Sequence, residues 1–241
     1  MAAMLYRDKH KEKVEEFLLV CNILADRMFV TSHGGNLAYK LEEDVYLITP
    51  TRRYKNILVP EDLVFINIKG EVLEGEREPT GEMPMYLNLF MERPDIISAI
   101  HCHPVYTNAF TIMKGTNWLM RPLYPELILE AGPIPVVPYG EPLSQELADN
   151  FKPFLQKYNT FLMENHGLTA ISRSDLLRLM HIVDMVEVSA VAILSALAVG
   201  EIKEIPRHEV ENLARTMKTR ELPMIGAPGA NESIVELFYS N

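Results

Sequence analysis

The chain has 241 residues, 48% hydrophobic and 23% charged, which is typical of a globular protein with a substantial core. Its net charge of −10 at pH 7 argues against a nucleic-acid partner, because phosphate backbones would be repelled, and favours small-molecule chemistry. With only two cysteines, Cys21 and Cys102, we expect no disulfide framework and a reducing cytoplasm. The N-terminal segment lacks an apolar signal core, and the most apolar stretch, 188–199, is too short to span a bilayer, so we expect no membrane contact.

Patterns of apolar residues predict helices and strands interspersed along one chain. Apolar side chains at helical spacing predict helices over 7–27, 79–91, 144–158 and 174–199. β-Branched and alternating runs bounded by Gly or Pro predict strands within 31–40, 44–50, 62–76, 95–100, 134–140 and 160–171. The segment 62–76 has the pattern of a hairpin that turns at Lys69-Gly70. Because no linker interrupts the chain, residues 1–241 predict a single domain with a mixed sheet covered by helices and a C-terminal tail from about 219.

The segment AIHCHP, residues 99–104, places two histidines one residue apart at the end of a predicted buried strand. Side chains alternate across a strand, so His101 and His103 should share one face while Cys102 lies on the other. Two neutral imidazoles on one face suit a divalent metal ion. The alternative is a chance pairing, which this pattern alone does not exclude.

A third histidine and a glutamate could complete such a site. His166 also follows a strand-like run, and Gly167 would permit a tight turn that presents the imidazole at a sheet edge. Glu82 is in the first turn of a predicted helix, directly after Pro-Thr-Gly. The alternatives are an exposed loop histidine and a glutamate that only complements the helix dipole. Together, three histidines and one carboxylate predict a site for zinc or another borderline divalent ion.

Two further stretches have the composition of an anion site. The sequence Gly34-Gly35-Asn36 can expose consecutive backbone N–H groups and a side-chain amide. The sequence TPTRRY at 49–54 offers threonine hydroxyls and the guanidinium groups of Arg52 and Arg53. Each signal is weak alone, because glycine turns and surface arginines are common.

The ordered set GGN, ITPT, PTGE, HCHP and NHG resembles the class II aldolase and adducin-head family over about residues 8–200. The best-known enzymes of this family are the L-fuculose-1-phosphate and L-rhamnulose-1-phosphate aldolases. The resemblance implies an α/β fold of three layers, α/β/α, with a central, largely antiparallel mixed sheet, and a homotetramer with active sites at subunit interfaces. It also implies one zinc ion per chain, bound by His101, His103 and His166, with Glu82 as a further ligand and the catalytic residue. The positions that match the phosphate-binding residues of the family are Gly35, Asn36, Thr51, Arg52, Thr80 and Gly81.

The reaction implied by this resemblance is the reversible cleavage of a ketose 1-phosphate to dihydroxyacetone phosphate and an aldehyde. Glu82 would act as the base at carbon, and Tyr124 or Tyr239 could donate the proton that the aldehyde oxygen needs. The chain departs from the aldolases at Ala38 and Gly81, where hydroxyls are missing, and at Arg52, where the fuculose enzymes have glycine. We therefore expect a guanidinium, from Arg52 or its neighbour, to replace lost phosphate donors.

Other activities on the same scaffold remain open at this point. A pentulose-phosphate 4-epimerase usually carries aspartate where Glu82 stands, which favours the aldolase. The sequence does not exclude a decarboxylase or dehydratase that acts on a sugar-acid or thiosugar phosphate. A non-catalytic interaction module like the adducin head would have no need for the complete set of metal ligands.

Overall fold

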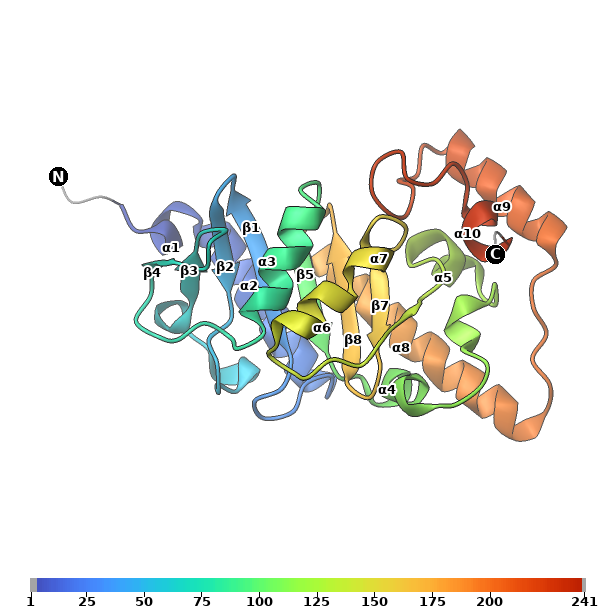
Figure 1. Ribbon diagram of the computed structural model, residues 1–241, viewed down its shortest axis with the longest axis horizontal. Helices are drawn as coiled ribbons and strands as arrows, with labels where there is room; N and C mark the ends of the chain where they lie inside the picture. The colour runs from blue at the N-terminus through green and yellow to red at the C-terminus, as the bar shows by residue number, and fades with distance from the viewer. Residues whose placement is uncertain (1–3, 240–241) are drawn as a thin grey trace.

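The computed structural model describes residues 4–239 and contains an eight-stranded sheet between two layers of helices (Figure 1). The strand order is β4-β3-β2-β1-β5-β8-β7-β6, and every neighbouring pair is antiparallel except β6 and β7. The strands are β1 (Asn36–Glu42), β2 (Val45–Ile48), β3 (Val64–Ile66), β4 (Val72–Glu74), β5 (Ser98–Cys102), β6 (Val136–Val137), β7 (Thr160–Met163) and β8 (Gly167–Ser172). The predicted α/β class with a largely antiparallel mixed sheet is confirmed.

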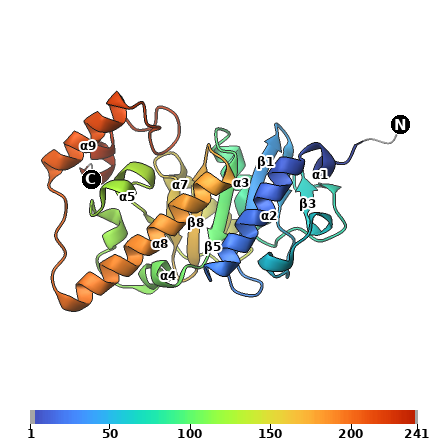
Figure 2. The same cartoon turned by 180° about the vertical axis from the view of Figure 1, so that it is seen from behind.

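Helices cover both faces of the sheet. In Figure 1, α3, α6 and α7 lie in front of the strands, and the reverse view shows α2 and α8 across the other face (Figure 2). The α-helices are α1 (Tyr6–Lys9), α2 (Lys11–Asp26), α3 (Met83–Glu92), α4 (Val105–Ile112), α5 (Pro125–Glu130), α6 (Gln145–Asn150), α7 (Lys152–Leu155), α8 (Leu176–Val199), α9 (Arg207–Thr219) and α10 (Ile234–Tyr239). Short 3₁₀ helices lie at η1 (Lys55–Ile57), η2 (Pro60–Asp62) and η3 (Trp118–Met120).

Strand β5 shows how the alternation of side chains builds two cores and positions the candidate site. Ile100 and Cys102 are buried in the core that includes residues of α2 and α8, whereas Ala99 is buried in the core that includes residues of α3. His101 is two residues from Ala99 and therefore faces the α3 side of the sheet. The loop that enters α3 carries Glu82 to this same side.

Four predicted elements differ from the structure. The helix expected over 79–91 begins at Met83, after Pro79 has formed a β-bridge with Pro50. The helix expected over 7–27 is interrupted at His10, whose backbone leaves the helical region (φ −113°, ψ 35°). The helix expected over 144–158 is divided at Phe151, because the ring nitrogen of Pro153 cannot donate to the carbonyl of the preceding turn. The strand expected over 134–140 contains only the two residues of β6. The hairpin of β3 and β4 is confirmed, with Gly70 in the left-handed region (φ 80°).

Helix α8 is longer than its most apolar stretch suggested. By length and composition alone, α8 meets the criteria for a helix that could cross a membrane, whereas the sequence interpretation considered only residues 188–199. One side of α8 is buried, with residues such as Leu179, Val183 and Ala190 in the core that it shares with β5 and β8. In the most apolar 18-residue window of α8, 33% of the residues are buried.

The C-terminal segment folds back onto the rest of the chain. Helices α9 and α10 pack against α5 in a separate small cluster, in which Ile128, Val210 and Ile234 are fully buried. Residues 220–239, which the sequence suggested were a tail, therefore include a packed helix.

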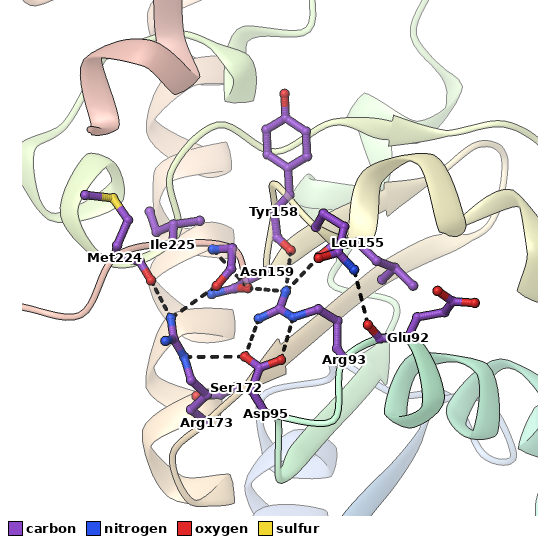
Figure 3. Close-up of polar contacts among 12 residues, drawn as sticks. Glu92, Arg93, Asp95, Leu155, Tyr158, Asn159, Ser172, Arg173, Met224 and Ile225 are labelled. Atoms are coloured by element: carbon purple, nitrogen blue, oxygen red, sulfur yellow. Dashed lines mark hydrogen bonds and ion pairs between the residues drawn. The ribbon is translucent and has the colours of Figure 1, made fainter. Parts of the chain in front are cut away.

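A buried ion network lies before the start of β5 (Figure 3). The side chain of Arg93 is fully buried and forms two 2.8 Å hydrogen bonds to the carboxylate of Asp95. Its remaining nitrogen donates to the carbonyls of Leu155 and Tyr158 and to the side chain of Asn159, at 2.7, 3.3 and 3.0 Å.

A second arginine connects this network to the C-terminal segment. Arg173 approaches Asp95 at 3.7 Å and donates to the carbonyls of Met224 and Gly226 (Figure 3). The network therefore joins three segments: the connection from α3 to β5, the residues just before β7, and the loop that follows α9.

Candidate active site

Three histidines meet at the end of β5. His101 is the fourth residue of this strand, His103 follows the strand, and His166 lies in the turn between β7 and β8. One ligand nitrogen from each residue lies within 4.8 Å of the others. The structure therefore brings together the three histidines that the sequence predicted as metal ligands.

Close packing in this region depends on small residues. A Cβ on Gly167 would lie 2.6 Å from the His103 ring, and one on Gly34 would lie 2.9 Å from its Nδ1. The sequence interpretation assigned the tight turn to Gly167, but it is Asn165 that adopts the left-handed conformation (φ 55°). Gly167 instead makes room for the histidine rings.

The Nε2 atoms of His101 and His166 face the carboxylate of Glu82, and that of His103 lies against His101. Oε2 of Glu82 lies 3.5 Å from Nε2 of His101, and Oε1 lies 3.4 Å from Nε2 of His166. The Nε2 atoms of His101 and His103 are 3.0 Å apart. Glu82 is buried, occupies the N-cap position of α3 and forms no capping hydrogen bond with its side chain. Its carboxylate faces the histidines, so a role limited to the helix dipole does not describe it.

The protonation of His101 follows from its surroundings. Its Nδ1 contacts the carbonyl oxygen of Leu168 at 3.0 Å, and because a carbonyl can only accept, Nδ1 carries the proton and Nε2 a lone pair. Burial, together with the neighbouring His166, lowers the pKa of His101 to about 3. Burial also lowers the pKa of His103 to about 3, with further contributions from the other two histidines. These imidazoles are therefore neutral near pH 7, the form that binds a metal ion.

The donor set fits a divalent metal ion. Two imidazole nitrogens at 3.0 Å need a proton or a cation between them, because their lone pairs repel each other. A cluster of three histidines and one carboxylate matches the ligands of zinc and related ions. Two buried atoms of the surroundings, Nδ1 of His166 and Oδ1 of Asn108, have no hydrogen-bond partner in the described part of the chain.

Asn36 connects the predicted anion loop with Glu82. It lies opposite His101 in the β1–β5 pair, and its side-chain amide donates to Glu82 at 2.6 Å. The hydroxyl of Tyr86, on α3, donates to the backbone carbonyl of Asn36 at 2.6 Å. Gly35, directly before it, is in the left-handed region (φ 69°). The sequence predicted that Asn36 binds phosphate, and the structure adds a contact with the carboxylate.

The other two predicted phosphate stretches run side by side. The backbone N–H of Thr51 donates to the carbonyl of Glu78, and that of Thr80 donates to the carbonyl of Thr49, both at 3.0 Å. Because Gly81 and Glu82 follow Thr80, this pairing connects the predicted phosphate loop to the carboxylate beside the histidines.

The two arginines of this loop have different surroundings. Arg53 pairs with the buried carboxylate of Asp62 at 3.3 Å, and Arg77 contacts the same carboxylate. Arg52 is exposed, forms no side-chain hydrogen bond or ion pair within residues 4–239, and has a left-handed backbone (φ 53°). Arg52 is therefore free of partners in the described chain, whereas Arg53 is paired through one terminal nitrogen and keeps a buried Nε without a partner there.

The two candidate proton donors lie on other elements. Tyr124 is the N-cap residue of α5 and is 38% exposed, and Tyr239 on α10 packs against Arg207. Neither contacts Glu82 or the three histidines within the described residues. A role for either tyrosine would therefore require the site of a second copy of the chain.

Sequence reasoning missed a charged residue close to this site, Lys55. It is only 3% exposed, at the start of η1 and three residues after Arg52. Its burial has no signal in the sequence, because lysines in polar loops are usually exposed.

Comparison with known proteins identifies the family of the chain. Residues 15–194 match the model of the class II aldolase and adducin N-terminal domain family. The chain is 31% identical to a 5-deoxy-D-ribulose 1-phosphate aldolase of Bacillus thuringiensis, over 76% of this chain and 84% of that protein. It is 29% identical to an L-fuculose phosphate aldolase of Methanococcus maripaludis, over 66% of this chain and 84% of the relative.

A decarboxylase is also among the similar proteins. The chain is 29% identical to a 3-oxo-tetronate 4-phosphate decarboxylase of Pectobacterium atrosepticum, over 58% of this chain and 65% of that enzyme. Among solved structures, an L-fuculose 1-phosphate aldolase superposes with a TM-score of 0.75 at 28% identity, covering 86% of this chain and 96% of the other. YgbL from Klebsiella pneumoniae superposes with a TM-score of 0.78 at 26% identity, covering 84% and 98%. The family match spans well over half of the sequence, and the chain belongs to the class II aldolase and adducin N-terminal domain family.

Proposed function

We propose that the chain is a zinc-dependent aldolase that reversibly cleaves a ketose 1-phosphate to dihydroxyacetone phosphate and an aldehyde. The observation that carries this proposal is the convergence of the Glu82 carboxylate and the three histidines at one end of β5. The named relatives are aldolases and decarboxylases, and the chain is accordingly an enzyme of the lyase class.

His101, His103 and His166 would hold the metal ion, with Glu82 beside them. When bound, the ion supplies Lewis acidity that stabilises negative charge on the ketone oxygen.

In the aldol direction, Glu82 takes a proton from the carbon next to the ketone of dihydroxyacetone phosphate, that carbon bonds to the aldehyde carbon, and Tyr124 or Tyr239 of a second copy donates a proton to the aldehyde oxygen. In the cleavage direction, the same tyrosine takes the hydroxyl proton back as the carbon–carbon bond breaks. The electron pair of that bond moves toward the ketone, and the protonated Glu82 returns its proton to carbon.

Asn36 would hold the Glu82 carboxylate in position for this transfer, since its amide already donates to Oε2 at 2.6 Å. The paired stretches that contain Thr51 and Thr80 would bind the phosphate through hydroxyl and backbone groups, together with Gly35 and Gly81. Arg52 would add a positive charge at the rim of this pocket.

A homotetramer is part of the proposal, because the candidate proton donors are remote from the histidines of their own chain. Exposed apolar side chains support association. Val188 is 60% exposed on α8, and Val105 and Tyr106 at the start of α4, next to His103, are 64% and 48% exposed. Apolar residues grouped beside a site are typical of an interface.

Decarboxylation of a 3-oxo sugar-acid phosphate is the second candidate, and the similarity to the tetronate-phosphate decarboxylase favours it. Loss of carbon dioxide would leave an electron pair on the same carbon. Glu82 would then act only as a proton donor to that carbon.

The test is a screen of ketose 1-phosphates and 3-oxo-tetronate 4-phosphate with the zinc-loaded enzyme, with and without a chelator. Dihydroxyacetone phosphate is measured with a coupled dehydrogenase, and carbon dioxide is measured in parallel. The aldolase proposal expects chelator-sensitive release of dihydroxyacetone phosphate from a ketose 1-phosphate, without carbon dioxide. Decarboxylation of 3-oxo-tetronate 4-phosphate also yields dihydroxyacetone phosphate, so release of both products from this substrate, with no cleavage of any ketose 1-phosphate, would identify the decarboxylase instead.

A further inference from the structure

Lys55 is a buried cation without an opposite charge. The residue is 3% exposed, and its Nζ donates one hydrogen bond, to the carbonyl oxygen of Arg53 at 3.1 Å. It forms no ion pair with any carboxylate between residues 4 and 239. An ammonium group has three donors, and lysine is almost never fully buried unless it is paired. The side chain therefore has hydrogen-bonding capacity that the protein leaves unused.

The position of Nζ is tied to the predicted phosphate loop. Its acceptor is the backbone of Arg53, two residues after Thr51, so the ammonium lies against the buried side of this loop. The 3₁₀ helix that begins with Lys55 packs against α2. The loop itself is fixed beside the stretch that leads to Glu82 by the bond from Thr51 to the carbonyl of Glu78.

The charge of Lys55 also acts on the candidate active site. Burial lowers the pKa of Lys55, and the nearby Cys21 thiol and Glu82 carboxylate oppose this shift.

The other cations of the loop are less suited to a buried anion. The charge of Arg53 is already paired with Asp62, although its buried Nε has no partner in the described chain, and Arg52 is exposed to solvent, where its charge is screened. Lys55 is shielded from water, so its attraction for an anion is stronger than that of an exposed arginine.

We propose that the Lys55 ammonium is the buried counter-charge for the phosphate group of the substrate, which makes Lys55 a specificity-determining residue for phosphorylated ketoses. The proposal rests on the proposed aldolase function for the identity of the substrate. It accounts for a costly feature of the fold, because the unpaired charge destabilises the empty protein and is compensated only when an anion binds.

The test compares Lys55→Met, which keeps the length of the side chain but removes its charge, with Lys69→Met as the control. Lys69 is an exposed lysine in the turn between β3 and β4, so both variants change the net charge equally. Binding of inorganic phosphate to the zinc-loaded proteins is measured by calorimetry. KM is measured for a ketose 1-phosphate and for the same ketose without phosphate.

We expect Lys55→Met to weaken phosphate binding and raise KM for the phosphorylated ketose about tenfold or more, the range for a hydrogen bond to a charged group. KM for the unphosphorylated ketose and the zinc content should be unchanged, and the melting temperature should be equal or higher. Lys69→Met should behave as the wild type.

Unchanged phosphate binding in Lys55→Met would overturn the proposal. A lower melting temperature together with an equal rise in KM for both ketoses would also overturn it. Phosphate binding requires no turnover, so the two proposals can fail separately. If the wild type binds phosphate through Lys55 but cleaves no ketose phosphate, only the aldolase assignment is refuted.

Discussion

The two ends of β5 both hold buried polar side chains, but these are satisfied in different ways. Before the strand, all three guanidinium nitrogens of Arg93 donate to protein oxygens (Figure 3). After the strand, the buried atoms Oδ1 of Asn36, Oδ1 of Asn108 and Nδ1 of His166 have no partner in the described chain, and Lys55 uses one of its three donors. Before β5 the protein itself satisfies the hydrogen-bonding groups of Arg93, whereas after β5 several buried polar groups are left to bind a ligand.

This comparison predicts that substitutions after β5 will change activity and those before it will change stability. The largest expected effect is on turnover in Glu82→Gln. An amide cannot accept the proton from carbon, so we expect kcat to fall roughly 10²- to 10⁴-fold while the fold and most of the metal remain. Steady-state kinetics and metal analysis of the same sample measure both. A variant that turns over at nearly the wild-type rate would show that the base lies elsewhere.

The next effect is on stability at the other end. Arg93→Met removes one partner of a buried ion pair and leaves Asp95 and several carbonyls without their donor. We expect the free energy of unfolding to fall by about 3–5 kcal/mol in urea titrations. Metal affinity of the folded protein should be retained. Lys55→Met is the matched comparison, because it removes a buried cation that has no carboxylate partner. An equal decrease in the free energy of unfolding of the two variants would contradict the proposed difference between the two ends of β5.

The pH dependence of stability should locate part of this effect at Asp95. Burial raises the pKa of this carboxyl, but the hydrogen bonds and charge of Arg93 outweigh burial, and the pKa is lower than its ordinary value of 3.8. A carboxyl with a lowered folded-state pKa contributes stability above its unfolded pKa and loses it as the pH falls through the folded value. The stability difference between wild type and Asp95→Asn should therefore be constant near neutral pH and shrink below about pH 4. A difference that does not change with acidification would exclude this origin.

The smallest effect is expected at Arg52, the exposed cation at the rim of the predicted anion pocket. Arg52→Gly removes the charge and suits the left-handed backbone at this position. We expect KM for a ketose 1-phosphate to rise roughly two- to fivefold, as for a solvent-screened charge, and KM for the unphosphorylated ketose to change little. A larger effect here than in Lys55→Met would reverse the proposed order of the two cations.

Much of this arrangement could be predicted from short-range patterns. The alternation of side chains placed His101 and Cys102 on opposite faces, and apolar runs indicated most strands of the sheet. Residue types and turn signals grouped Glu82 with the three histidines, the family resemblance implies the same set, and these four residues do meet.

Features that depend on long-range packing could not be predicted from the sequence. Nothing in the sequence indicated that Asn36 would donate to Glu82, or that Arg53 would be held by Asp62 while Arg52 stayed exposed. The burial of Lys55 depends on the packing of η1 against α2, which local composition does not reveal. The division of the helix expected over 144–158 could have been predicted, because Pro153 lies within it.

The central claim is that the histidines at the end of β5 hold a metal ion, and metal analysis of wild type and His103→Ala tests it most directly. Both proteins are purified without chelator, dialysed against zinc, freed of excess metal and measured by plasma emission spectroscopy. We expect about one zinc ion per wild-type chain, a large loss in His103→Ala, and the same circular dichroism spectrum for both. Equal metal content in the two proteins, or none in either, would contradict it.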